Sequence, residues 1–173
     1  MLQEFRTSAK PDHGLIEIYD SDACLTDPDA TDRAREHVVA GTGPQIYLHS
    51  PQGTAPVDIL LRVWDGPAPP DEAWDAQGEA HLSFEVPTGA VVIRAFVPEI
   101  AGCIELPRPG LYDARLSWRG RAAGARQEAD LLAELVNAEG EAATETVFAT
   151  HQQALEGYRL DLWWTAECSD EDD

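Results

Sequence analysis

Two tryptophans and a group of carboxylates share one short, proline-rich stretch of the chain, WDGPAPPDEAW. Trp64 and Trp74 bracket this stretch, and its prolines restrict the backbone. A tryptophan supplies a large anchor area for a protein partner, while carboxylates steer a basic partner toward the surface. We therefore predict a protein-binding site, which consists of Trp64, Asp65, Asp71, Glu72, Trp74, Asp75 and Glu79.

Established catalytic and metal-binding patterns are absent from the sequence. The chain lacks G-x-S-x-G, H-E-x-x-H and a Walker loop, and its 5 histidines are scattered. The acids that follow Asp20 do not have the ligand spacing of an EF-hand loop. We expect no catalytic residue, no metal and no cofactor. One enzymatic alternative stays open, in which Asp20 or Asp22 works with Glu85 as an unfamiliar carboxylate site.

Charge is strongly negative and unevenly distributed. The 173 residues hold 32 Asp and Glu against 12 Lys and Arg, a formal net charge of -20. Residues 63–93 and 127–158 contain no Lys or Arg, whereas five arginines fall within residues 108–126. Because nucleic-acid binding depends on cations that neutralise phosphates, we expect no direct contact with nucleic acid, and none with an anionic membrane. The charge favours a basic protein partner and a monomer or weak homo-oligomer.

Alternation of apolar and polar residues with a period of two dominates the chain, as in EAHLSFEV and GYRLDLWWT. About nine such strands are separated by short turns rich in Pro and Gly. The pattern predicts an all-β fold, a mostly antiparallel β-sandwich with two short helical insertions. It indicates one domain over residues 1–166, followed by an acidic tail at 167–173.

The two helical insertions have different signals. The first starts at Asp27-Pro28, a capping residue followed by a proline at the first helical position, and is expected to run to a stop at Gly41. The second is QEADLLAELVN, residues 127–137, with a stripe of leucines. Residues 142–156 do not distinguish an irregular segment from a helix.

Cysteine usage and the N-terminus place the chain in the cytoplasm. Cys24, Cys103 and Cys168 are an odd number and far apart, which favours neither a disulfide framework nor a zinc site. Cys103 lies in an alternating stretch and is expected to be a small buried side chain. No signal peptide and no apolar run of membrane-spanning length are found in the sequence.

The order of these elements resembles the competence protein J family. The resemblance is carried by GLIEIYDSD, GTGPQIYLHS, VDILLRVWDG, AHLSFEVPTGAVVIRA and IELPRPGLYDARLSW, within residues 14–118. It implies a small bacterial β-sandwich protein, and the family's name derives from an inhibitor of a DNA-entry nuclease. The resemblance assigns no functional role to any single residue of this chain.

Charge and resemblance together predict a non-enzymatic, acidic protein-binding module. Such a module would act as an inhibitor or immunity-type protein on a basic effector, such as a nuclease or a toxin, by placing carboxylates where DNA phosphates would lie. Three alternatives stay open beside it. One is a β-sandwich that binds small molecules or carbohydrates on surface tryptophans, and another is the carboxylate enzyme described above. The third is a structural homo-oligomer.

Overall fold

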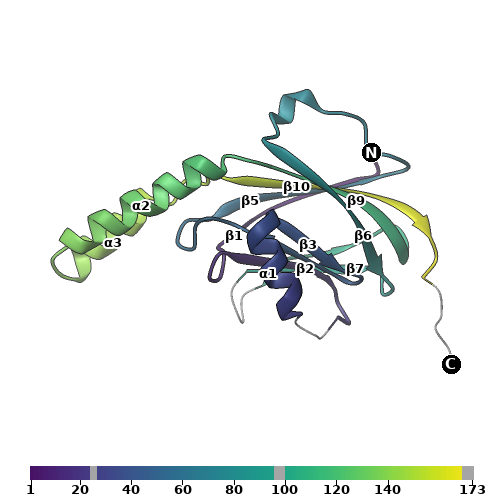
Figure 1. The fold of residues 1–173 in the computed structure, drawn as a ribbon, viewed down its shortest axis with the longest axis horizontal. Coiled ribbons are helices and arrows are strands. Elements are labelled where there is room, and N and C mark those ends of the chain that lie inside the picture. Colours follow the sequence, from purple (N-terminus) through teal and green to yellow (C-terminus); the bar gives the residue numbers. More distant parts are fainter. Residues whose placement is uncertain (24–26, 96–99, 169–173) are drawn as a thin grey trace.

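Ten strands and three helices make up the computed structural model, which describes residues 1–23, 27–95 and 100–168 (Figure 1). The strands are β1 (Gln3–Ala9), β2 (Leu15–Asp20), β3 (Val39–Thr42), β4 (Gln45–His49), β5 (Val57–Trp64), β6 (Gly78–Val86), β7 (Ala90–Arg94), β8 (Ile100–Glu105), β9 (Gly110–Arg119) and β10 (Gly157–Ala166). The helices are α1 (Pro28–His37), α2 (Arg121–Asn137) and α3 (Glu141–Thr150), with a short 3-10 turn, η1, at Glu72–Trp74.

A mostly β fold with helical insertions is confirmed. The sequence predicted two helices, whereas the described residues form three. The additional helix is α3, which covers most of the segment that the sequence left undecided. None of its residues is buried. Its half-buried face consists of Ala143, Thr144, Val147 and Phe148, and only two of these side chains are large and apolar, so the periodic signal in the sequence is faint.

The strands form two five-stranded sheets. The first sheet has the order β1-β5-β10-β9-β6, and the second has the order β3-β4-β2-β7-β8. All pairings are antiparallel except that of β5 with β10. Strand β10 therefore lies in the middle of the first sheet, although it is the last element of the chain.

Apolar side chains of both sheets form one core. The alternation in β9 and β10 is confirmed, because Leu116, Leu160 and Leu162 are completely buried. The second sheet contributes residues such as Ile18 and Ile46 to the same cluster. Cys103, by contrast, is exposed. Its expected burial is wrong because its neighbour Ile104 faces the core, and successive residues of a strand point to opposite faces.

Helix α1 packs on the outer face of β3 and β4 through Ala30 and Ala34. Its start is as predicted, with the Asp27 carboxylate accepting a hydrogen bond from the backbone N–H of Ala30. Its predicted end near Gly41 is wrong. The helix ends at His37, and the residues Val39–Thr42 instead pair with β4 as strand β3. A long-range pairing of this kind overrides the local continuation of a helix.

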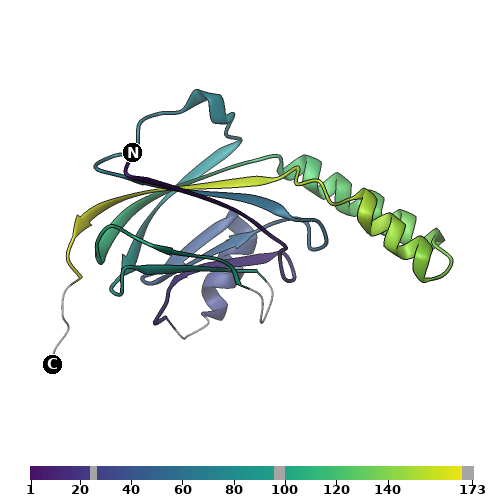
Figure 2. The same cartoon turned by 180° about the vertical axis from the view of Figure 1, so that it is seen from behind.

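Helices α2 and α3 form a hairpin that projects away from both sheets (Figure 2). Helix α2 starts at Arg121, earlier than predicted from its leucine stripe. The hairpin is inserted between β9 and β10, and at its base the Gln127 side chain donates hydrogen bonds to the backbone oxygens of His151 and Gln153. Within the described ranges, no helix is long and apolar enough to cross a membrane. Cys24 and the last residues of the acidic tail lie outside the described residues.

Candidate protein-binding site

The loop between β5 and β6, residues 65–77, lies over the outer face of the first sheet. Its two flanking strands are not neighbours, because β10 and β9 lie between them. The loop must therefore pass over both of these strands, and in Figure 1 it is the teal segment above the sheet. The predicted binding residues thus sit on a bridge across the sheet instead of at the end of the two-sheet body.

Trp74 fastens this loop to the sheet. Its side chain is only 9% exposed. The guanidinium carbon of Arg119 lies 4.1 Å from the centre of the Trp74 ring, and that of Arg159 lies 5.0 Å from it. Cation–π contacts of this geometry are favourable, and more so where water is excluded. In this conformation Trp74 has little area to offer a partner or a stacked sugar.

Asp71 makes a second attachment. One of its carboxylate oxygens accepts hydrogen bonds from Arg62 at 3.1 Å and from Arg159 at 2.8 Å. These arginines belong to the adjacent strands β5 and β10. The carboxylate of Asp71 is therefore already paired with two cations of its own chain.

Beneath the loop, Asp161 is the centre of a buried charge network. Its side chain is completely buried and accepts hydrogen bonds from Arg62 at 2.7 Å, from the Trp64 indole at 2.8 Å and from Arg115 at 3.2 Å. Burial by itself would raise the pKa of Asp161. The hydrogen bonds from Arg62 and Trp64, together with the charges of Arg62 and Arg159, hold this pKa below its usual range instead.

Four of the predicted acids point into solvent. They are Asp65, Glu72, Asp75 and Glu79, all of which are exposed. The predicted residues therefore fall into two groups in the structure. Trp64, Asp71 and Trp74 contact charged side chains on the outer face of the first sheet, and the four exposed acids surround these contacts. We call this charged group, Arg62, Arg115, Arg119, Arg159 and Asp161, the arginine platform. Both groups of predicted residues belong to the restrained loop or to the strand ends that it joins, Trp64 of β5 and Glu79 of β6, so the outward carboxylates are held in place over the sheet.

The arginines and Asp161 of this platform were not predicted as part of the site. The alternation of apolar and polar residues correctly places Arg62, Arg159 and Asp161 on the faces opposite the core. The sequence signal that could have revealed the platform is the presence of both positive and negative residues at these outward positions. Opposite charges on adjacent strands form cross-strand pairs, and a loop that covers them excludes water.

The carboxylates of the enzymatic alternative have other partners. Asp20 is completely buried, and its side chain accepts hydrogen bonds from the backbone N–H of Asp22 and of Thr88. Asp22 and Glu85 are exposed. Among the described residues, no group of three or more His, Cys, Asp or Glu side chains has the arrangement of a metal site.

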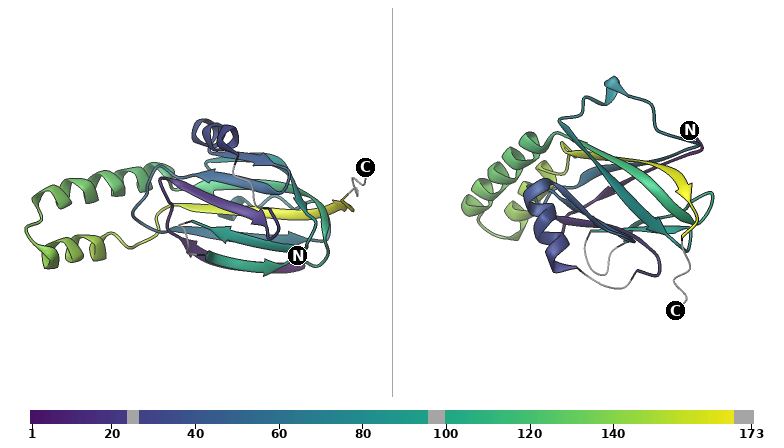
Figure 3. Two further views of the ribbon diagram at one scale, coloured as in Figure 1. Left: turned by 90° about the horizontal axis from the view of Figure 1, so that it is seen from below. Right: turned by 45° about the vertical axis from the view of Figure 1, so that its right-hand side comes forward.

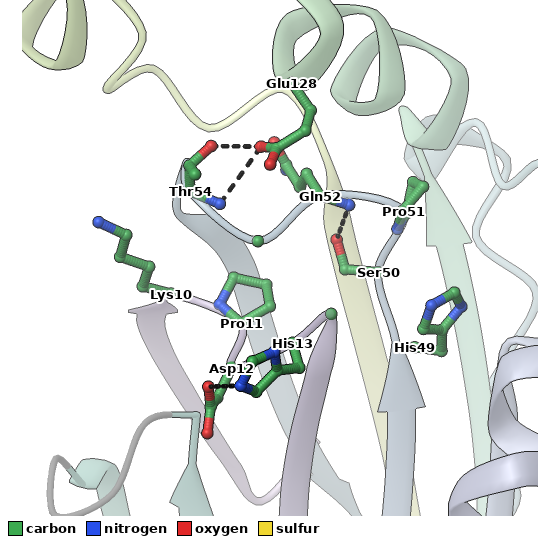
Figure 4. A pocket seen from close by; sticks show the side chains of 12 residues that line it. Lys10, Pro11, Asp12, His13, His49, Ser50, Pro51, Gln52, Thr54 and Glu128 are labelled. Carbon is green, nitrogen blue, oxygen red and sulfur yellow. Dashed lines mark hydrogen bonds and ion pairs between the residues drawn. The ribbon is translucent and has the colours of Figure 1, made fainter. Parts of the chain in front are cut away.

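A cavity of about 860 Å³ lies at the base of the helical hairpin (Figure 4). The turn between β1 and β2, the loop between β4 and β5, and Glu128 of α2 line it. Thr54 of the β4–β5 loop donates hydrogen bonds to the Glu128 carboxylate through its backbone N–H and its hydroxyl. This contact ties the hairpin to the body of the protein.

Next to this cavity, the carboxylate of Glu156 is completely buried. It accepts hydrogen bonds from Ser50 at 2.8 Å, from Gln52 at 3.2 Å and from the Tyr158 hydroxyl. Burial raises the pKa of Glu156, and the hydrogen bonds from Tyr158 and Ser50 offset this only in part. The carboxylate therefore joins the start of β10 to the β4–β5 loop, in surroundings that disfavour its charged form.

We expect Glu156→Gln to change how stability depends on pH. A carboxyl whose pKa is raised on folding makes the protein less stable as the pH rises from its ordinary value of 4.5 through the raised value. The glutamine variant should lack this loss, so that its advantage over the native chain is larger at pH 7 than at pH 4. Urea unfolding at the two pH values measures the difference.

Glu156→Ala serves as the control for this substitution. It removes the hydrogen-bond acceptor as well as the charge, and should lower stability at both pH values by about 1–3 kcal/mol. If the native chain and Glu156→Gln lost equal stability between pH 4 and pH 7, the assignment of this pH dependence to Glu156 would be wrong.

The structure defines a class of protein, a strongly acidic two-sheet β protein with a projecting helical hairpin. Its fold is that of ComJ from Bacillus subtilis, described as an inhibitor of the DNA degrading activity of NucA. The two chains are 15% identical, and the superposition covers 95% of this chain and 99% of ComJ with a TM-score of 0.61. The predicted ComJ-like fold is confirmed, and it extends well beyond residues 14–118.

A second solved structure, described as crocagin biosynthetic gene J, is less similar. It is 16% identical, covers 93% of this chain and 95% of its own, and gives a TM-score of 0.49. No protein-family model and no curated protein sequence matches the chain.

Proposed function

We propose that this chain is a non-enzymatic inhibitor that binds a basic protein, such as a nuclease or a toxin. The observation that carries the proposal is the ComJ-like fold over 95% of the chain, since ComJ is an inhibitor of a nuclease. The net charge of -20 gives the chain what an inhibitor of a DNA-binding protein requires, a negative surface that competes with phosphates.

The loop over the first sheet is the proposed contact surface. The exposed acids of the loop and of the start of β6, Asp65, Glu72, Asp75 and Glu79, would face the cationic surface of the partner. Trp64, Asp71 and Trp74 would hold the loop in its binding conformation through the arginine platform. A surface that is already ordered loses less conformational entropy on binding, which raises affinity.

The same negative charge also bears on the oligomeric state of the protein. Like charges repel, so the acidic surface disfavours self-association and favours a monomer. We place this monomer in the bacterial cytoplasm. The two sheets serve as a sandwich scaffold whose core takes no part in binding.

The test is inhibition of DNA degradation by the nuclease of the source organism that is most similar to NucA. We expect the native chain to inhibit this nuclease, with an association rate that falls steeply between low and high salt. Amide substitution of all four exposed loop acids should slow association about tenfold or more at low salt, because rim charges act mainly on the on-rate. Stopped-flow mixing measures this rate.

A matched variant distinguishes a local effect from one of net charge. It carries Asp22→Asn, Glu36→Gln, Glu105→Gln and Glu167→Gln, four exposed acids outside the loop. This variant should associate within about threefold of the native rate, since distant surface charges are largely screened. Equal effects of the two variants would reject the loop as the contact surface, and an absence of inhibition by the native chain would reject the nuclease as its target.

A further inference from the structure

The helical hairpin is an addition to a strand pairing that is complete without it. Arg119 at the end of β9 lies opposite Gly157 at the start of β10, so the two strands pair right up to the base of the hairpin. A short turn would suffice to join strands in this register. The chain instead runs out through α2 and returns through α3, forming an arm that extends far from both sheets (Figures 1 and 3).

The arm has an apolar face that nothing in the described part of the chain covers. Leu132 and Val136 are four residues apart on α2 and therefore lie on one face of the helix. They are 51% and 86% exposed. Leu131 is buried, and it marks the side of α2 that is already packed. Helix α3 buries none of its residues, so the arm adds little to the stability of the body.

The charge of the arm indicates what would cover this face. Arg121 and Arg126 lie at the base of the arm, and beyond them residues 127–150 contain six acids and no Lys or Arg. Five of these acids, Asp130, Glu134, Glu139, Glu141 and Glu145, are exposed. Glu134 also lies 3.4 Å from His151, and Glu128 accepts hydrogen bonds from Thr54. A second copy of this chain would bring like charges together, which disfavours it as the occupant.

We infer that the α2–α3 arm is a second contact surface for the basic partner, in which Leu132 and Val136 pack against an apolar part of that partner. The inference rests on the proposed function and extends it. The exposed acids at the end of the arm meet cationic groups that flank this apolar contact. An inhibitor with both a loop over its sheet and a projecting arm can hold one partner at two separate places.

Two variants of the arm test this inference against the same nuclease. Leu132→Ser with Val136→Ser should raise the dissociation rate about tenfold or more, because desolvated apolar anchors govern dissociation. Glu139→Gln, Glu141→Gln and Glu145→Gln together should slow association about fivefold at low salt and leave dissociation within twofold. Because all five side chains are exposed, the variants should unfold in urea at the native midpoint.

Two controls complete the experiment. Asp22→Asn, Glu36→Gln and Glu105→Gln match the charge change of the acidic arm variant, and Met1→Ser with Leu2→Ser matches the loss of exposed apolar side chains. If the native chain inhibits the nuclease while the arm variants behave like these controls, the arm is not a contact surface and the proposed function stands. If the native chain does not inhibit the nuclease at all, both proposals fail together.

Discussion

Replacing Asp161 with alanine is expected to destabilise the protein by about 3–5 kcal/mol, because it removes the buried counter-charge of Arg115 and leaves Arg62 and Arg159 with Asp71 alone. The arginine side chains around Asp161 are only 11% (Arg62), 13% (Arg115) and 4% (Arg159) exposed. Loss of the one fully buried carboxylate among them would force these cations toward water or apart. Urea unfolding at pH 7, followed by tryptophan fluorescence, measures the change.

Two further variants show whether the charge network is the cause. Asp161→Asn keeps an acceptor for Arg62 and Trp64 but removes the charge, so its loss should be smaller. Asp113→Ala removes an exposed acid on the adjacent strand and should change stability by less than about 0.5 kcal/mol. If Asp161→Ala were no worse than Asp113→Ala, the network would contribute nothing measurable.

The pH dependence of Asp161 provides an independent check. Its pKa is lower in the folded protein than its ordinary value of 3.8, although burial by itself acts in the opposite direction. A carboxyl of this kind stabilises the fold above its ordinary pKa, and the contribution is lost as the pH falls through the lowered value. The native chain should therefore lose stability below about pH 4, and Asp161→Asn should lose less over the same range.

The inward faces of the strands could be predicted from the sequence because they depend on a local pattern. A period of two identifies which residues of β9 and β10 face the core, whatever their neighbours are. The outward faces could not be predicted in the same way. Arg159 and Asp161 have the pattern of solvent-facing residues, but they are 3% and 0% exposed because the loop from another part of the chain covers them.

The helices show the same division between local and distant causes. The start of α1 at Asp27-Pro28 was predictable, since capping involves residues within one turn. Its end was not, because Val39 leaves the helix to pair with Leu48 of β4. The position of β10 between β5 and β9 is also a distant effect. It decides that the acidic loop must cross the sheet, and no pattern within residues 64–79 contains that information.

Trp74→Ala is expected to destabilise the protein by about 3 kcal/mol or more, close to the cost of removing a core tryptophan. The side chain packs on Arg119 and Arg159 and covers the end of the platform, so its loss uncovers the buried Arg159 and releases the loop. A released loop should be cut after Glu72 by a glutamyl protease faster than in the native chain. Unfolding in urea and limited proteolysis measure the two effects.

Trp163→Ala is the matched control, because Trp163 faces outward from β10 and is only half-buried. It should cost clearly less and leave cleavage within residues 65–77 unchanged. Asp71→Asn should couple to Trp74→Ala, since both residues hold the same loop on Arg159, and the double variant should lose less than the sum of the two. The opposite result would be that Trp74→Ala has the urea midpoint of the native chain and only weakens binding of the nuclease. Trp74 would then be an anchor for the partner and would not hold the loop on the sheet.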